Sequence, residues 1–273
     1  MQADAMAKRS SRTRRHAPKR SSGASGTAKG PLRLYGLHAV RNAVANPRRR
    51  AHRLFATESA FQRLGIEPDC PLELVETAVL DRLVGRDAVH QGVVLECNPL
   101  ERIDGSELFR LADARLVLVL DQVTDPHNFG AVLRSAVAMA ADFVVTTHRN
   151  AAPETGVLAK SASGALDLVE VAEVRNLSGA LQTLSDYGFA SFGLDSGGPD
   201  DITAAFQALS PERIAIVLGA EGRGLREGTR AACDALVRLD MPGPIKSLNV
   251  SNAAVLALYL ARAALATQSS KPR

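Results

Sequence analysis

Short polar side chains and glycines gather in three segments of this 273-residue chain, and each segment directly follows a run of apolar residues. The segments are 121–134, 219–225 and 239–251. Their guanidinium, carboxylate, amide and hydroxyl groups can hold a ligand by hydrogen bonds and can stabilise charge that develops in a reaction. Ligands of parallel α/β sheets bind where strands end, so the three segments are predicted to meet at one site.

The first segment offers groups suited to an anion. Asn128 is predicted to cap a helix that begins near Ala131, and Gly130 lets a backbone or a ligand approach closely. Arg134 then lies about one turn into that helix, beside its positive end. There a guanidinium can bind a phosphate with two hydrogen bonds or stabilise an oxyanion.

Two questions stay open in this segment. Arg134 either has that role or only forms an ion pair with Asp121 or Asp125. His127 is either a catalytic base or a solvated side chain, which is the commoner state of a lone loop histidine.

The second segment carries three glycines, Gly219, Gly222 and Gly224, after the apolar run 214–218. They permit tight turns and expose backbone N–H groups, so the main chain could hold a small ligand, although a simple turn explains them equally well. Their spacing is not G-x-G-x-x-G and they do not open a first βαβ unit. This argues against a dinucleotide-dependent oxidoreductase.

The third segment begins as a rigid, extended loop because 242–244 reads Pro-Gly-Pro. Ser247, Asn249 and Ser251 follow at the start of an apolar helix that is expected to run to about Ala266. Helix capping explains one of these three side chains. The excess of hydrogen-bonding groups indicates a ligand pocket.

The fold that positions these segments is predicted from apolar runs that lack polar alternation, which is typical of parallel strands buried on both faces by helices. The expected class is α/β with a mostly parallel sheet. The runs are 116–120, 143–145, 168–171, 189–194, 214–218 and 236–239.

A smaller α/β unit is predicted before this sheet. Helical patterns cover 38–45 and 79–84, and strand patterns cover 53–56 and 92–95. The segment 98–115 is expected to be a linker with one short helix, because it contains Pro99, Gly105 and several charges.

Charge is distributed unevenly along the chain, whose formal net charge is +4. Residues 1–30 hold eight Lys and Arg against one acidic residue and contain no Leu, Ile, Val, Phe, Tyr or Trp, so a disordered basic tail is expected. A second basic run, 41–53, contains five arginines and no acid. Both segments are candidate contacts for a polyanion, with nucleic acid the natural partner, although the tail could equally be only solubilising.

Composition excludes other classes. The hydrophobic content of 46% is ordinary for a globular protein. The three cysteines are too far apart in sequence for a paired metal-binding or redox motif, so no metal and a reducing cytoplasm are expected. The longest uninterrupted apolar stretch near the C-terminus, 253–261, is shorter than the roughly 18 residues of a membrane span, so a soluble protein is expected.

The three segments match in order the motifs of a known family. Asn128-x-Gly130-x-x-x-Arg134, then Gly219-Ala-Glu-Gly-Arg-Gly-Leu225, then Ser247-Leu-Asn-Val-Ser251-x-Ala253 resemble those of the SpoU family within the SPOUT superfamily. Members are RNA ribose 2′-O-methyltransferases with a C-terminal trefoil knot, and they use S-adenosylmethionine. The resemblance covers about 116–266. One departure is Asp240, where the family commonly has proline.

The resemblance also implies a domain organisation. Segment 34–95 is similar to the small ribosomal-protein-like substrate domain of large-subunit rRNA guanosine methyltransferases. The domains expected are a basic tail over 1–31, an RNA substrate-binding domain over 32–97, a linker over 98–115 and a knotted methyltransferase domain over 116–273. A homodimer through the helix around 256–265 is also implied, unless that helix only covers its own sheet.

By motif position, the resemblance assigns roles to nine residues and requires no metal. The expected catalytic and RNA-orienting set is Asn128, Arg134, Glu221, Ser247 and Asn249, and the expected cofactor-binding set is Gly219, Leu239, Met241 and Leu248. Arg134 is expected to act as a cation rather than as a base, because a guanidinium is hardly ever neutral.

The function implied is methyl transfer from S-adenosylmethionine to a ribose 2′-hydroxyl, with a guanosine of large-subunit rRNA as the expected target. The alternatives are a tRNA ribose 2′-O-methyltransferase and a non-catalytic RNA-binding factor for ribosome assembly. The sequence does not name the nucleotide, because RNA is usually recognised by shape and unpaired bases.

Overall fold

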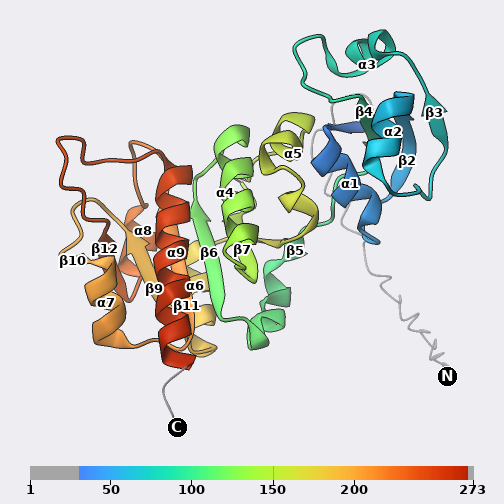
Figure 1. Cartoon of the computed structure of the whole chain (residues 1–273). Coiled ribbons are helices and arrows are strands. Elements are labelled where there is room, and N and C mark those ends of the chain that lie inside the picture. Colours follow the sequence, from blue (N-terminus) through green and yellow to red (C-terminus); the bar gives the residue numbers. More distant parts are fainter. Residues whose placement is uncertain (1–30, 150, 270–273) are drawn as a thin grey trace, which may run out of the picture. The chain divides into compact units, whose positions relative to one another are not determined.

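Two sheets make up the computed structural model, which describes residues 31–149 and 151–269 (Figure 1). The basic tail predicted over 1–31 therefore lies outside the described residues except for Pro31. The smaller sheet comes first in the chain and the larger sheet carries the three polar segments.

The smaller sheet is mixed and has the strand order β1-β4-β2-β3. β4 runs antiparallel to both β1 and β2, whereas β2 and β3 are parallel. The predicted helices and strands of this unit match α1, α3, β2 and β4 to within two residues, and β1, β3 and α2 were not predicted. The elements are β1 (Leu32–Tyr35), α1 (Leu37–Ala45), β2 (Ala51–Ala56), α2 (Glu58–Leu64), β3 (Leu72–Leu74), α3 (Thr77–Val84) and β4 (Val93–Cys97).

The larger sheet confirms the predicted parallel α/β class. Its strand order is β10-β12-β9-β11-β6-β7-β8-β5, and neighbouring strands run parallel throughout the described residues. The strands are β5 (Ile103–Asp104), β6 (Leu116–Asp121), β7 (Phe143–Thr147), β8 (Glu170–Val174), β9 (Ala190–Leu194), β10 (Asp200–Asp201), β11 (Ile214–Gly219) and β12 (Ala235–Arg238).

Burial on both faces explains why these strands are continuous apolar runs. In β6, Leu116, Leu118 and Leu120 pack into one core, while Val117 and Val119 pack into a second core on the opposite face. All five side chains are fully buried. Successive side chains of a strand point to opposite faces, so every position of a doubly covered strand must be apolar.

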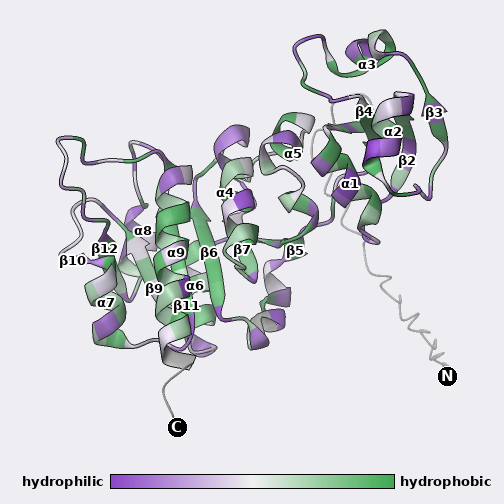
Figure 2. Ribbon diagram, in the orientation of Figure 1, coloured by the Kyte–Doolittle hydropathy of each residue, from purple (hydrophilic) through white to green (hydrophobic). Residues whose placement is uncertain are grey.

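Helices cover both faces of this sheet (Figures 1 and 2). On one face, α9 packs against α4, α7 and β11, and α5 packs against α4. On the other face, α6 packs against β9, α8 and η1. The helices are η1 (Gly105–Asp113), α4 (Pro126–Ala138), α5 (Gly156–Ala162), η2 (Ala165–Asp167), α6 (Leu177–Asp186), α7 (Ile202–Leu209), α8 (Glu227–Ala231) and α9 (Val250–Ser269).

Two segments differ from the sequence-based expectation. The segment 98–115, expected to be a linker with one short helix, does form a short helix, η1, but it also contributes β5 to the edge of the larger sheet, parallel to β8. The strand expected over 168–171 lies two residues later, as β8, because Leu168 ends η2 and is 59% exposed. A leucine that belongs to an apolar run in the sequence is not necessarily buried in the structure.

Helix α9 is long and apolar enough over Val250–Thr267 to cross a membrane, by length and composition alone, and a third of that window is buried. The uninterrupted apolar stretch 253–261 is only part of this helix, which is why no segment of membrane-spanning length was predicted. The inner face of α9, which includes Ala254, Leu258 and Ala261, lies in the core beside α4 and β11. Mostly buried core helices of soluble proteins pass the same test of length and composition.

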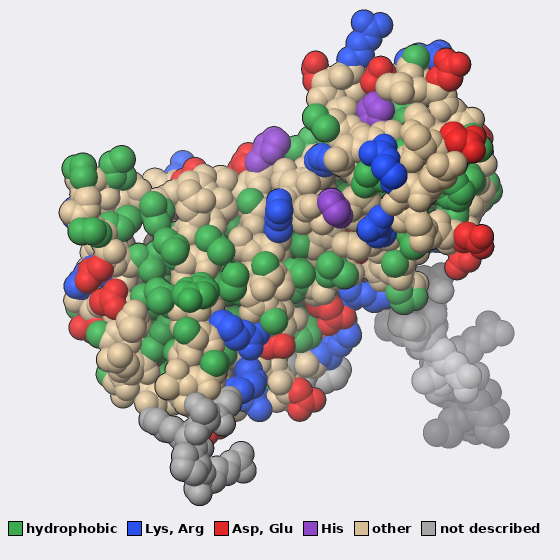
Figure 3. Space-filling model, in the orientation of Figure 1, with side chains coloured by type: hydrophobic (Ala, Val, Ile, Leu, Met, Phe, Trp, Pro, Cys, Tyr) green, Lys and Arg blue, Asp and Glu red, His purple; other side chains and the backbone are tan. Residues whose placement is uncertain are grey.

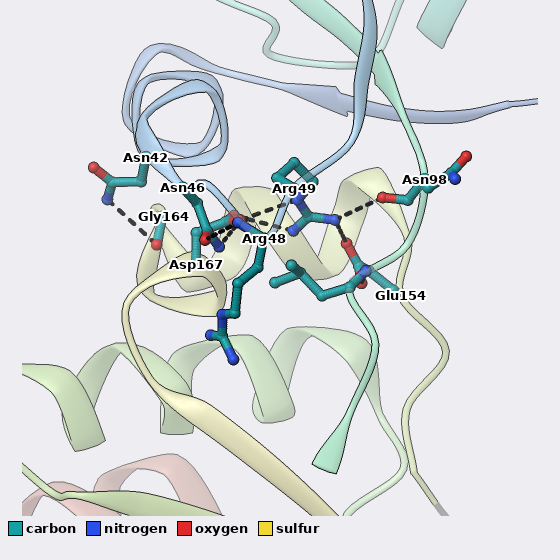
Figure 4. Close-up of polar contacts among 9 residues, drawn as sticks. Asn42, Asn46, Arg48, Arg49, Asn98, Glu154, Gly164 and Asp167 are labelled. Carbon is teal, nitrogen blue, oxygen red and sulfur yellow. Dashed lines mark hydrogen bonds and ion pairs between the residues drawn. The ribbon is translucent and has the colours of Figure 1, made fainter.

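The basic run 41–53 was expected to contact a polyanion, but its arginines do not form a single surface in the structure. The Arg49 side chain is fully buried, and its guanidinium donates two hydrogen bonds to the Asp167 carboxylate, at 3.0 and 3.1 Å (Figure 4). It also bonds to the Glu154 carboxylate and to the Asn98 carbonyl oxygen. Arg49 therefore joins the smaller unit to the segments around α5 and η2 of the larger one.

Two other arginines of this run are paired at the surface. Arg48 forms an ion pair with Glu170 at 2.8 Å, and Arg53 forms one with Glu73 at 2.7 Å. These pairs compensate the charge that the sequence pattern assigned to RNA binding.

Candidate functional site

The helix that follows β6 begins earlier than predicted. Asp125, not Asn128, is the N-cap of α4, and its carboxylate accepts a hydrogen bond from the Asn128 backbone N–H at 2.8 Å. Pro126 occupies the first turn, where its missing N–H costs nothing. Asn128 consequently lies inside the first turn, and Arg134 lies about two turns from the positive end rather than one.

Three predicted catalytic residues from distant parts of the chain meet in one cluster. The Asn249 amide donates to Asn128 Oδ1 at 3.0 Å and to Glu221 Oε1. The Asn128 amide also donates to Glu221 Oε1, at 3.3 Å. The structure thus brings together side chains from α4, from the glycine-rich loop after β11 and from the loop before α9.

The start of α9 completes this cluster. Glu221 Oε1 accepts the Val250 backbone N–H at 3.2 Å, and Asn249 Oδ1 accepts the Ser251 backbone N–H at 2.9 Å and the Ser251 hydroxyl at 2.6 Å. Helix capping therefore uses Asn249 Oδ1, while its amide group serves the cluster. Asn128 is half-buried, whereas Glu221 and Asn249 are exposed and accessible to a ligand.

A cavity of about 270 Å³ lies beside this cluster. Its walls come from the loops after β9, β11 and β12 and from the first turn of α9. All four residues predicted to bind the cofactor line it, and so do two of the predicted catalytic residues. These six are Gly219, Leu239, Met241, Leu248, Glu221 and Ser247.

The loop after β9 was missed by sequence reasoning. Leu194, Asp195 and Ser196 also line the cavity. The available signal was a polar turn directly after the predicted strand 189–194, the same pattern that marked the other three loops. Because β9 lies next to β11 in the sheet, its carboxyl end faces the same cavity.

The glycine-rich loop is held tightly against the end of β11. A Cβ atom at Gly219 would lie 2.2 Å from the Gly224 carbonyl carbon, so only glycine permits this approach. The Gly224 N–H donates to the Ala220 carbonyl at 2.9 Å and closes the loop. At Gly130 the expected close approach is to protein rather than to a ligand, because a Cβ atom there would meet the Leu158 carbonyl of α5 at 2.7 Å.

Asp121 fixes the glycine-rich loop from the neighbouring strand. Its fully buried carboxylate accepts from the Arg226 guanidinium at 2.7 Å and from the Arg226 backbone N–H at 3.0 Å. The predicted alternative, an ion pair of Arg134 with Asp121 or Asp125, is therefore wrong. Arg134 is exposed, and within the described residues it forms no ion pair and no hydrogen bond with Asn128, Glu221 or Asn249.

The loop that contains Asp240, where the family commonly has proline, is restrained by an ion pair. Asp240 forms an ion pair with Arg238 at 2.8 Å, at the end of β12. Burial is the largest single effect on Asp201 and raises its pKa, but hydrogen bonds from Thr203, Ala204 and the backbone N–H of Asp240 together lower it below its usual value. These contacts restrain the loop where a proline would restrict it covalently.

The thiols are not suited to nucleophilic chemistry. Burial is the main cause that raises the pKa of both Cys97 and Cys233 to about 12, so both are protonated at neutral pH. Among residues 31–149 and 151–269, no group of three or more His, Cys, Asp or Glu side chains could hold a metal ion.

The cavity has an apolar surface and charged side chains of both signs. Leu194, Leu218 and Leu239 offer the apolar surface. Asp195, Glu221 and Lys246 also line the cavity, and Asp195 forms an ion pair with Arg230. This mixed lining suits an amphipathic ligand, and S-adenosylmethionine, which combines an apolar ring, a sulfonium cation and an amino-acid group, fits it.

The sheet is parallel, and loops at the ends of its strands form the cavity. The protein is therefore an α/β protein with a small-molecule site at the carboxyl edge of its sheet. Within that class the chain belongs to the SpoU rRNA Methylase family, whose family model matches residues 115–259. A second family model, RNA 2′-O ribose methyltransferase substrate binding, matches residues 33–103. These two matches contain all the polar clusters described above.

The chain is similar to named methyltransferases over most of its length. It is 33% identical over 250 residues to the 23S rRNA (guanosine-2′-O-)-methyltransferase RlmB of Vibrio vulnificus, covering 86% of this chain and 98% of that protein. It is 38% identical over 202 residues to RlmB of a Burkholderia species, covering 73% and 80%.

Solved structures share the fold. The SpoU methyltransferase AviRb of Streptomyces viridochromogenes, in complex with AdoMet, superposes with a TM-score of 0.69 at 22% identity, covering 89% of this chain and 92% of that one.

Proposed function

We propose that this protein transfers a methyl group from S-adenosylmethionine to the 2′-hydroxyl of a guanosine ribose in 23S rRNA. The observation that carries this proposal is the meeting of Asn128, Glu221 and Asn249 beside the cavity, from three motifs far apart in sequence. Membership of the SpoU family and the names of the Vibrio and Burkholderia relatives support the reaction and its target.

In this reaction S-adenosylmethionine would supply a methyl carbon that its sulfonium activates. The ribose oxygen bonds to that carbon while the carbon–sulfur bond breaks with its electron pair going to sulfur, and the hydroxyl proton passes to a phosphate oxygen or to water. The protein's own contribution is alignment and charge stabilisation, and alignment can supply on the order of 7 to 11 kcal/mol. Gly219, Leu239, Met241 and Leu248 are proposed to hold the cofactor, with Leu194 as a further apolar contact.

The polar cluster is proposed to hold the ribose. Glu221 Oε1 already accepts two amides and one backbone N–H, so Glu221 orients Asn128 and Asn249 rather than acting as a free base. Ser247 lies on the cavity wall, where its hydroxyl can contact the ligand. Arg134 is proposed to bind the adjacent phosphate and to stabilise the alkoxide as a cation, since a guanidinium stays protonated.

Methylation of an unmodified 23S rRNA transcript tests this function. With S-adenosylmethionine, the wild-type protein is expected to form one ribose-methylated guanosine and one S-adenosylhomocysteine per transcript, as measured by mass spectrometry of nucleosides and cofactor product. Methylation of tRNA transcripts but not of rRNA would replace the proposed substrate with the tRNA alternative. Tight RNA binding without any methyl transfer would support a non-catalytic assembly factor instead.

The finer organisation is proposed from the same family. Residues 32–97 are proposed to bind the RNA substrate, 98–115 to connect, and 116–273 to form the methyltransferase domain with a trefoil knot. The substrate-binding family model over 33–103 supports the first assignment. The chain returns from β12, near one edge of the sheet, to α9, which packs against α4 and β11 in the middle of the sheet. This return is compatible with a threaded C-terminal segment. A cytoplasmic location follows from an rRNA substrate.

We further propose a homodimer through the outer face of α9. Leu256 and Tyr259 on this face are 46% and 61% exposed, and Figure 3 shows hydrophobic side chains gathered over α9 and α7. Light scattering is expected to give twice the chain mass of 28.9 kDa, and Tyr259→Asp is expected to shift the mass toward one chain. A wild-type mass of one chain at micromolar concentration would contradict the dimer.

A further inference from the structure

The cations of the described chain fall into two groups. Many arginines pair with carboxylates, as Arg33 does with Glu96 and Arg102 with Glu173. Others form hydrogen bonds only with neutral acceptors. Among these, one set is connected into a row that ends at the catalytic cluster, partly by hydrogen bonds and partly because its members are adjacent in sequence.

The row begins on the smaller unit. The Arg41 guanidinium of α1 donates to the backbone carbonyls of Arg63 and Leu64 at the end of α2, at 2.7 and 3.0 Å. Arg63 in turn donates to the carbonyls of Ser59 and Gln91, at 3.3 and 3.5 Å. Each guanidinium uses Nε and Nη2 in these bonds, so Nη1 of each remains available to a further acceptor.

Gln91 carries the row to the larger unit. Its Oε1 atom accepts the Lys160 ammonium of α5 at 2.7 Å and the Leu37 backbone N–H at 3.2 Å. Next to Lys160, the Ser161 hydroxyl lies 3.1 Å from Nδ1 of His127 at the start of α4. His127 is adjacent to Asn128, which belongs to the catalytic cluster.

Arg134 extends this row along α4. It follows His127 by seven residues, which places both side chains on the same face of the helix. In Figure 3, Lys, Arg and His side chains lie over α4, α5 and the helices of the smaller unit. We define Arg41, Arg63, Lys160 and His127 as the basic row; none of the four forms an ion pair with a carboxylate within the described residues.

The positive charges of Arg41, Arg63 and Lys160 are not compensated by an ion pair within the described residues. Lys160 is the clearest case, because burial lowers its pKa and its hydrogen-bond acceptor is a neutral amide. A bound anion would offset that desolvation and would accept the free donors of Arg41 and Arg63.

We propose that the basic row binds successive phosphates of the RNA substrate and leads the strand from α2 across α5 to Asn128 and Arg134. This inference rests on the proposed function, and it names the path by which RNA reaches that site. Phosphate contacts carry no sequence information, so the row fixes position and orientation while recognition of the base belongs elsewhere.

The double variant Arg63→Gln/Lys160→Gln tests the path, because glutamine keeps a hydrogen-bonding side chain and removes both charges. Affinity for an unmodified 23S rRNA transcript is expected to fall about tenfold, and the slope of log affinity against log salt is expected to decrease by about 2. KM for RNA should rise with kcat nearly unchanged. Affinity for S-adenosylmethionine, measured by calorimetry, should not change.

Arg82→Gln is the matched control. Like Arg63, Arg82 is an exposed arginine in the last turn of its helix and donates from Nε to the carbonyl four residues earlier, at 3.1 Å. If the double variant keeps the salt slope of Arg82→Gln while the wild-type protein methylates the transcript, the path is wrong and the proposed function stands. If the slope falls as expected but the wild-type protein transfers no methyl group, the path stands and the proposed function is wrong. Absence of salt-dependent RNA binding by the wild-type protein would also overturn the path.

Discussion

Replacing Arg134 with alanine is expected to lower kcat for RNA methylation by about 10²- to 10³-fold while leaving the affinity for S-adenosylmethionine unchanged. Arg134 is exposed, and Asp121 and Asp125 are engaged with Arg226 and with the start of α4. No carboxylate within the described residues therefore neutralises it. Its charge is available to a phosphate or to a developing alkoxide. As negative charge grows on the ribose oxygen, the attraction of the Arg134 guanidinium for that oxygen is stronger in the transition state than in the bound substrate.

The lysine variant separates charge from base chemistry. Arg134→Lys keeps the positive charge but loses the planar fork, so it is expected to retain part of the activity. Single-turnover methylation with saturating RNA measures this, with Arg82→Ala as a control arginine on α3. If the lysine and alanine variants are equally inactive while RNA remains bound, a cationic role is wrong.

The parallel sheet could be predicted because its physical cause is written locally in the sequence. Strands covered on both faces must be apolar at every position, as Val117 and Leu118 are, and such runs are visible without a structure. The same reasoning located the site, since polar loops after neighbouring strands must converge. Three of the five predicted catalytic residues contact one another, and all four predicted cofactor residues line one cavity.

Features that depend on partners distant in sequence could not be predicted. A run of arginines looks alike whether each side chain meets solvent, a surface glutamate or a buried carboxylate. Arg49 and Arg48 are adjacent, yet one is fully buried and the other is 44% exposed. The edge strand β5 also escaped prediction, because two residues give no periodicity and only their pairing with β8 defines them.

The N-cap of α4 was assigned to the wrong residue for a local reason. Asp125 and Asn128 are both good caps, and the following Pro126 decides between them because proline favours the first helical position.

The basic row could not be predicted for a different reason. Its members come from α1, α2, α4 and α5 and are connected by Gln91 and Ser161, which no charge pattern distinguishes.

Replacing Arg49 with methionine is expected to lower the free energy of unfolding by about 3 to 5 kcal/mol, the range for breaking a buried ion pair on one side. The side chains of Glu154 and Asp167 are 5% and 2% exposed, so both carboxylates would lose their guanidinium partner away from water. Urea unfolding measures the loss. Arg48→Met is the matched control, and because its pair with Glu170 is solvent-exposed, a loss below about 1 kcal/mol is expected.

The pH dependence of the Arg49→Met variant distinguishes unpaired charge from lost packing. Burial already raises the pKa of Glu154, and Arg49 opposes that rise. Without Arg49 the pKa rises further, so the folded state binds more protons than the unfolded state above about pH 4, and the free energy of unfolding falls as pH increases. The loss in this variant should therefore be smaller at pH 5 than at pH 7. Adding Glu154→Gln and Asp167→Asn should recover part of it, because neither buried group is then charged. A loss that is independent of pH, or no larger than that of Arg48→Met, would mean that Arg49 contributes packing alone.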